Sequence, residues 1–160
     1  MKETIYRRHS LGDLQDYWLR RSLRAWYRIS DAKGFFHLVD DLKPILSNPD
    51  LMRPASTLFL VEGANPQDYV IVQQGSQARM GLGKNLTGCR LGDYADQNYV
   101  GAVGDQLDQT VKRPEVAYHE VVATIAGRTF HYDRLTFPVL WRGSIDQILT
   151  VVQWRSPVWH

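Results

Sequence analysis

The sequence predicts an α+β fold: a five-stranded antiparallel sheet with short helices on one face and an N-terminal amphipathic helix on the other. Three observations predict it. The first thirty residues carry a helical apolar pattern, and β-branched and aromatic runs dominate after residue 55. The run 145–154 places large apolar side chains on both of its alternating faces. A sheet with one solvated face would alternate cleanly, so both faces of this sheet need cover.

Residues 10–29 are predicted to form the amphipathic helix, with Ser10 as its N-cap and Asp13 completing a weak capping box. Several arginines occupy its polar half, which we interpret as a solvated helix face. Its apolar half includes four residues expected at an interface: Leu14, Trp18, Leu23 and Trp26. We expect this apolar half to cover the sheet within one chain or across a homodimer, and we predict the homodimer.

A second short helix is predicted over 35–46, followed by a connector punctuated by Asn48-Pro49 and Arg53-Pro54. At this connector the residue pattern changes from helical periodicity to β-branched and aromatic runs. We therefore divide the chain into an N-terminal helical cap and dimerisation segment, residues 1–54, and a core, residues 55–160.

Within the core, 57–61 and 69–72 are predicted to form a hairpin. Five glycines between 75 and 94 favour tight turns and single helical turns. A helix is expected over 96–112. Three strands, 116–125, 129–140 and 145–154, then form an antiparallel meander.

Composition excludes several classes of protein. With 160 residues, 44% of them hydrophobic, the chain is predicted to be one globular unit and not a disordered tail. A net charge of +2 is too small for a dedicated nucleic-acid binder. One cysteine, Cys89, excludes an internal disulfide, and the sequence shows neither a signal peptide nor a run of about 18 apolar residues. We expect a cytoplasmic protein with no nucleic-acid or membrane partner.

The order of these elements over residues 56–155 resembles a PAS domain. The segments 75–79 and 83–91 resemble the glycine-containing block of the PAS_5 family, whose members are mainly small bacterial, largely alphaproteobacterial, proteins. Residues 113–116 and 132–139 are similar to two of that family's strand segments, and the resemblance extends over roughly 14–155. The chain departs from the family at 35–39, where a proline-rich stretch is common.

The resemblance implies a stand-alone sensory or regulatory module of bacterial signal transduction, without catalytic output, that binds a small molecule or a signalling protein partner. Its pocket would lie between residues 75–112 and the inner face of the meander. Six residues are candidates for its lining: Met80, Leu86, Tyr99, Val103, His119 and Phe130.

Two alternatives remain at this point. One is a protein-interaction adaptor with a filled core and no ligand. The other is a small cone-type α+β lyase or isomerase. Asp133 shares strand parity with His131, and an apolar cavity raises the pKa of a carboxyl group that it encloses. The more ordinary role for Asp133 is a solvated strand residue or an ion pair with a neighbouring arginine.

Metal, haem and flavin are disfavoured as cofactors. The five histidines show no metal-ligand spacing, and the helix over 96–112 lacks the histidine that haem-binding PAS domains usually carry there. The word Gly-Cys-Arg-Leu-Gly around Cys89 matches a flavin-photoadduct motif only in part. His119 shares its parity with apolar residues, and we expect it to be a hydrogen-bonded core residue.

Overall fold

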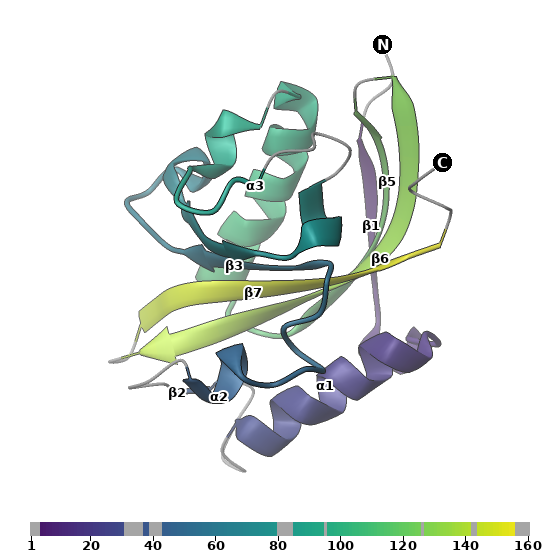
Figure 1. Ribbon diagram of the computed structural model, residues 1–160, viewed down its shortest axis with the longest axis vertical. Helices are drawn as coiled ribbons and strands as arrows, with labels where there is room; N and C mark the ends of the chain where they lie inside the picture. The colour runs from purple at the N-terminus through teal and green to yellow at the C-terminus, as the bar shows by residue number, and fades with distance from the viewer. Residues whose placement is uncertain are drawn as a thin grey trace.

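The computed structural model describes residues 4–30, 37–38, 43–79, 85–94, 96–125, 127–141 and 144–155. Its centre is a sheet of six antiparallel strands in the order β1-β5-β6-β7-β3-β4 (Figure 1). The α+β class is therefore confirmed, but the predicted count of five strands is wrong, because an N-terminal strand, β1, pairs with β5.

The elements have the following bounds. The antiparallel strands are β1 Ile5–His9, β3 Ser56–Leu60, β4 Val70–Gln74, β5 Ala117–Ile125, β6 Arg128–Trp141 and β7 Ser144–Trp154. The described α-helices are α1 Tyr17–Ile29, α2 Lys43–Leu46 and α3 Gln97–Lys112. Short 3-10 helices are η1 Leu11–Asp13, η2 Pro66–Asp68, η3 Ser76–Arg79 and η4 Leu91–Asp93. The predicted hairpin, long helix and meander thus have boundaries within three residues of those observed.

Strand β1 is a charged edge strand. Tyr6 pairs with Val121 and packs on the core, whereas Ile5 and the two arginines that follow Tyr6 are exposed. Charged side chains on an edge strand protect it from pairing with another molecule. The same composition hides the strand from sequence analysis, because it lacks the alternation of apolar and polar residues.

The N-terminal helix begins later than predicted. Ser10 caps only η1, where its Oγ accepts a hydrogen bond from the amide of Gly12 at 3.3 Å. Asp16 is the N-cap of α1, and its carboxylate accepts from the amide of Leu19 at 2.8 Å. Because the Asp16 cap satisfies one of the free amides of the first turn, the α-helix starts at Tyr17.

Of the second predicted helix, over 35–46, the structure describes 37–38 and 43–46, and it confirms the helix over 43–46 but not over 37–38. Only α2 is helical, and His37–Leu38 form the short strand β2, which runs parallel to Val139–Leu140 of β6. β5 pairs with β6 only as far as Thr136, so β2 bonds to backbone groups of β6 that lie beyond the end of β5. The remainder of the prediction lies outside the described residues.

Helices cover both faces of the sheet (Figure 1). On the α3 face, α3 packs on side chains such as Val121 and Tyr132. On the α1 face, Trp26 of α1 is fully buried against Phe137 of β6, with ring centroids 4.9 Å apart. Successive strand residues point to opposite faces, so each strand contributes to both cores. The predicted cover of both faces is confirmed, and α1 provides it within one chain.

The glycine-rich segment folds into short helical turns where the structure describes it, as predicted. Gly75 holds the start of this segment against the connector before β3. A Cβ atom at Gly75 would lie 2.1 Å from the carbonyl oxygen of Pro54, so no side chain fits there. The amide of Gly75 donates to the carbonyl of Ser56 at 2.9 Å, which places η3 beside the start of β3.

Candidate functional site: a cavity beneath α3

A cavity lies between α3 and the sheet, with further walls from the connector before β3 and from η3 and η4. The centre of a water molecule can occupy about 30 Å³ of this cavity. The total empty space between its walls is about 430 Å³, which includes the part that is open to solvent. One bound water needs roughly 10–15 Å³ by the first measure, so the cavity as it stands has room for two or three water molecules. It is lined by Ala55, Thr57, Phe59, Ala78, Leu91, Tyr94, Tyr99, Val103, Tyr132, Arg134, Thr150, Val152 and Trp154.

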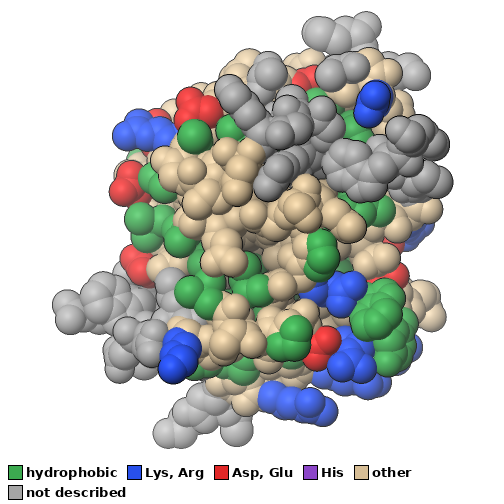
Figure 2. Space-filling view, in the orientation of Figure 1, with side chains coloured by type: hydrophobic (Ala, Val, Ile, Leu, Met, Phe, Trp, Pro, Cys, Tyr) green, Lys and Arg blue, Asp and Glu red, His purple; other side chains and the backbone are tan. Residues whose placement is uncertain are grey.

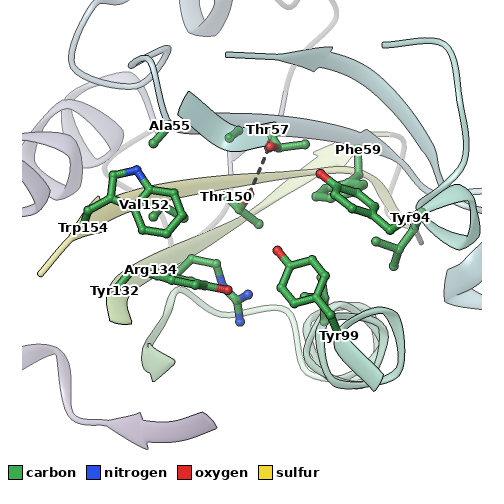
Figure 3. A pocket seen from close by; sticks show the side chains of 13 residues that line it. Ala55, Thr57, Phe59, Tyr94, Tyr99, Tyr132, Arg134, Thr150, Val152 and Trp154 are labelled. Carbon is green, nitrogen blue, oxygen red and sulfur yellow. Dashed lines mark hydrogen bonds between the residues drawn. The ribbon is translucent and has the colours of Figure 1, made fainter. Parts of the chain in front are cut away.

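Three tyrosines bring hydroxyl groups toward the middle of the cavity (Figure 3). Gln74 of β4 donates from its side-chain amide to the Tyr94 hydroxyl, so the O–H of Tyr94 remains a donor for another acceptor. Burial raises the pKa of Tyr94 to about 12, and it also raises the pKa values of Tyr99 and Tyr132. All three hydroxyls are therefore protonated donors at neutral pH.

Arg134 is the single charged residue among the described lining residues. Its side chain is 3% exposed, and it sits in the middle of the sheet between its cross-strand neighbours His119 and Val152. Nε and Nη2 of its guanidinium are buried and have no hydrogen-bond partner among the described residues. In Figure 3 the guanidinium lies between the side chains of Tyr132 and Tyr99. Buried charges are almost always paired, so an unpaired guanidinium in a cavity wall needs an explanation.

The lining is rich in hydrogen-bond donors. Besides the tyrosines and Arg134, the indole Nε1 of Trp154 is buried and has no partner in the part of the chain that the structure describes. Thr150 donates to the carbonyl of Thr57 at 3.3 Å. The described lining residues include no carboxylate, imidazole or thiol. Such a surface can bind a molecule that has an apolar body and hydrogen-bond acceptors, and it offers no acid–base pair poised near neutral pH.

The predicted lining residues divide into four groups. Tyr99 and Val103 line the cavity. Leu86 and Phe130 are buried in the core of the α3 face but do not line the cavity. His119 lines a separate, smaller pocket beside α3. Met80 lies outside the described residues. The prediction missed the residues that give the cavity its chemistry: Tyr94, Tyr132, Arg134 and Trp154.

His119 is buried, 3% exposed, as predicted for a core residue. The predicted hydrogen bond is not made by its Nδ1, which has no partner among the described residues. Burial lowers the pKa of His119 to about 3, with smaller contributions from the charges of Arg134, Arg8 and His9. His119 is therefore neutral at pH 7 and adds no second positive charge beside Arg134.

A second polar cluster lies on the opposite, α1 face of the sheet. Glu120 accepts hydrogen bonds from Nε2 of His9 at 3.0 Å and of His131 at 2.8 Å, and these lower the pKa of Glu120 to about 2. Asp133 accepts from the Tyr118 hydroxyl at 3.0 Å and from Nε and Nη2 of Arg155 at 2.7 and 2.8 Å. The alternative that put Asp133 inside the cavity is wrong about its position, because consecutive residues of β6 point to opposite faces.

Replacing Arg155 by methionine is expected to destabilise the protein by about 1–3 kcal/mol, because it leaves the buried Asp133 carboxylate with Tyr118 as its remaining donor among the described residues. Urea unfolding at pH 7 measures the change. Arg7→Met is the matched control, since Arg7 is exposed on β1. An Arg155→Met protein as stable as the control would contradict a structural role for this ion pair.

Most of the predicted interface residues pack within the fold, three of them on α1 or just before it. Leu14, Leu23 and Trp26 belong to the core of the α1 face, whereas Trp18 is 44% exposed and lies under the guanidinium of Arg53 at 4.7 Å. Basic side chains gather over α1 at the bottom of Figure 2. Its exposed arginines are Arg20, Arg21, Arg24 and Arg28. The basic side is therefore solvated, as expected, and the homodimer stays a prediction.

Comparison with known proteins does not assign this chain to a family. No family model, curated protein or solved structure matches it. Within the part of the chain that the structure describes, no group of three or more His, Cys, Asp or Glu is placed to hold a metal ion. In the same residues, no helix is long and apolar enough to span a membrane. Any assignment of function therefore depends on the cavity itself.

Proposed function

We propose that this chain is a PAS-type regulatory module that binds a small molecule in the cavity beneath α3 and has no catalytic output. The observation that carries the proposal is the cavity wall on the α3 face of the sheet: a buried Arg134 among tyrosine hydroxyls, with no ion-pair partner among the described residues. Ligand sites are typically apolar clefts with a few converging polar groups, and this lining has that character.

The architecture supports the PAS part of the proposal. From β3 to β7 the elements follow the order on which the PAS resemblance rests: a hairpin, short helical turns, one long helix and an antiparallel meander. Pairing of β3 with β7 joins the hairpin to the meander, so that β4-β3-β7-β6-β5 is one continuous sheet, as in a PAS domain. β1 and α1 are additions to that core.

The sheet offers a physical route from the cavity to α1. On β7, Thr150 and Val152 line the cavity, and Val151 between them packs in the core under α1. A guest that shifts β7 on one face must also move Val151 on the other. Binding would then favour one of two packings of α1, which is the usual basis of a ligand-driven switch.

Filling the cavity is expected to abolish ligand binding. Ala55→Leu adds three carbon atoms to the cavity wall, whereas Ala102→Leu on α3 adds the same volume outside the lining and is the matched control. Native mass spectrometry and thermal shift are run with the small-molecule fraction of a bacterial extract. We expect an adduct and a raised Tm for the wild type and the control, and neither for Ala55→Leu. No adduct and no shift with the wild type would overturn the proposal.

One observation favours the ligand-free adaptor as the second candidate. The space open to the centre of a water molecule is only about 30 Å³, so any guest larger than a few atoms requires its surrounding side chains to move. The adaptor predicts that Ala55→Leu leaves every binding property unchanged. The same experiment therefore separates the two candidates.

A further inference from the structure

We propose that the cavity is built for a small carboxylate with a flat apolar body, held by a two-pronged ion pair with Arg134. This inference rests on the proposed function, because it names the class of ligand for the same cavity. Its basis is the charge of the cavity wall, which is cationic and rich in donors, and has no carboxylate among its described residues.

The first step is that Arg134 lacks a counter-ion within the described fold. The acidic residue next to it in sequence, Asp133, points to the other face and is already bonded to Arg155 and Tyr118. Its cross-strand neighbour is His119, whose imidazole carries no negative charge in either protonation state. None of the described ion pairs includes Arg134. Among the described residues this buried cation therefore has no counter-ion, and a bound anion would supply one.

The second step is the match between the free donors and a carboxylate. Nε and Nη2 of a guanidinium form one edge of a planar fork that pairs with both oxygens of a carboxylate, and these are the two atoms of Arg134 without partners. The Tyr99 and Tyr132 side chains lie on either side of the guanidinium in Figure 3. Their protonated hydroxyls add donors beside the same anion.

The third step is the remainder of the wall. Phe59, Val103 and Val152 are apolar, and Trp154 adds an indole ring in edge contact with Tyr132, with centroids 5.0 Å apart. Flat rings pack well against such walls. The one positive charge in the described lining balances one negative charge, which favours a monocarboxylate over a phosphate or a dicarboxylate.

Benzoate, benzamide and benzylamine test the charge of the guest at nearly constant shape. Each is titrated into the wild type, Arg134→Met and the surface control Arg7→Met, with Tm and isothermal calorimetry as readouts. We expect benzoate to bind the wild type and Arg7→Met at least about tenfold more tightly than benzamide, since charge-assisted hydrogen bonds contribute that much, and benzylamine not to bind. Arg134→Met is expected to lose the preference for benzoate.

Without ligand, Arg134→Met is expected to raise Tm by about 2–4 °C, because an apolar side chain of similar length replaces a buried charge that has no partner among the described residues. A purely structural arginine would give the opposite sign. Arg134→Lys and the Nε–H NMR signal of Arg134 in the wild-type protein provide readouts that do not depend on the methionine variant folding. Benzoate is expected to shift that signal, and Arg134→Lys is expected to bind benzoate more weakly than the wild type.

Equal affinity for benzoate and benzamide, or no binding of benzoate to the wild type, would overturn the carboxylate assignment. A lower Tm for ligand-free Arg134→Met would also overturn it. These failures differ from a failure of the proposed function: if extract fractions still form an adduct with the wild type but not with Ala55→Leu, the cavity binds a small molecule of another class.

Discussion

Replacing Trp26 by alanine is expected to destabilise the protein by about 3–5 kcal/mol, as for other fully buried tryptophans. Trp26 is 0% exposed and is the largest side chain that α1 places in the core of the α1 face. Its ring lies over that of Phe137 at an interplanar angle of 32°. Removing it opens a cavity between α1 and the sheet. Urea unfolding at pH 7, followed by circular dichroism, measures the loss.

Trp18→Ala is the matched control, because the two tryptophans lie on the same helix and differ in burial. Trp18 is 44% exposed and contacts mainly Tyr17, Arg21 and Arg53. Its removal is expected to cost at most about 1 kcal/mol. Equal losses for the two variants would mean that α1 does not dock through Trp26. A larger loss for Trp18 would mean that a second chain covers it.

The sequence predicted the layers of this protein because hydrophobic periodicity records which faces are buried. The doubly apolar pattern of 145–154 required cover on both faces, and α1 and α3 supply it. Strand β1 and strand β2 were missed for a common reason. Both are short segments added to β5 or β6, and their own residues show no strand periodicity. Their structure depends on the edge that they join and not on local propensity.

The chemistry of the cavity was harder to predict than its position. Asp133-Arg134 looks like a surface ion pair when it is met as a sequence. In a strand the two side chains point to opposite faces, so one joins Arg155 and the other enters the cavity. Counting alternate residues from Phe130 through Tyr132 would have placed Arg134 on the α3 face. That signal was present, but a charged residue is rarely assigned to a buried face.

The wild-type protein is expected to lose stability between pH 6.5 and about pH 5. Replacing His119 by leucine is expected to remove most of that pH dependence. Burial lowers the folded-state pKa of His119 from 6.5 to about 3. The unfolded chain therefore takes up a proton below pH 6.5 that the folded chain does not, so the contribution is complete above pH 6.5 and is lost as the pH falls toward 3. Over the upper part of that range the loss is about 1.5 kcal/mol, and at pH 3 it is several kcal/mol.

Measurements between pH 6.5 and about pH 5 separate the effect of His119 on stability from that of Glu120. Glu120 has its pKa lowered from 4.5 to about 2 by hydrogen bonds from His9 and His131, so its contribution is lost only as the pH falls from 4.5 toward 2. Urea unfolding at pH 6.5 and at about pH 5 should thus give a slope for the wild type that His119→Leu lacks. Glu120→Gln should keep that slope and lose the dependence below pH 4.5. Equal stability of the wild type at pH 6.5 and at about pH 5 would mean that His119 takes up a proton in the folded state. The protonated His119 would then lie next to Arg134, and an anion or water in the cavity would have to screen the two positive charges.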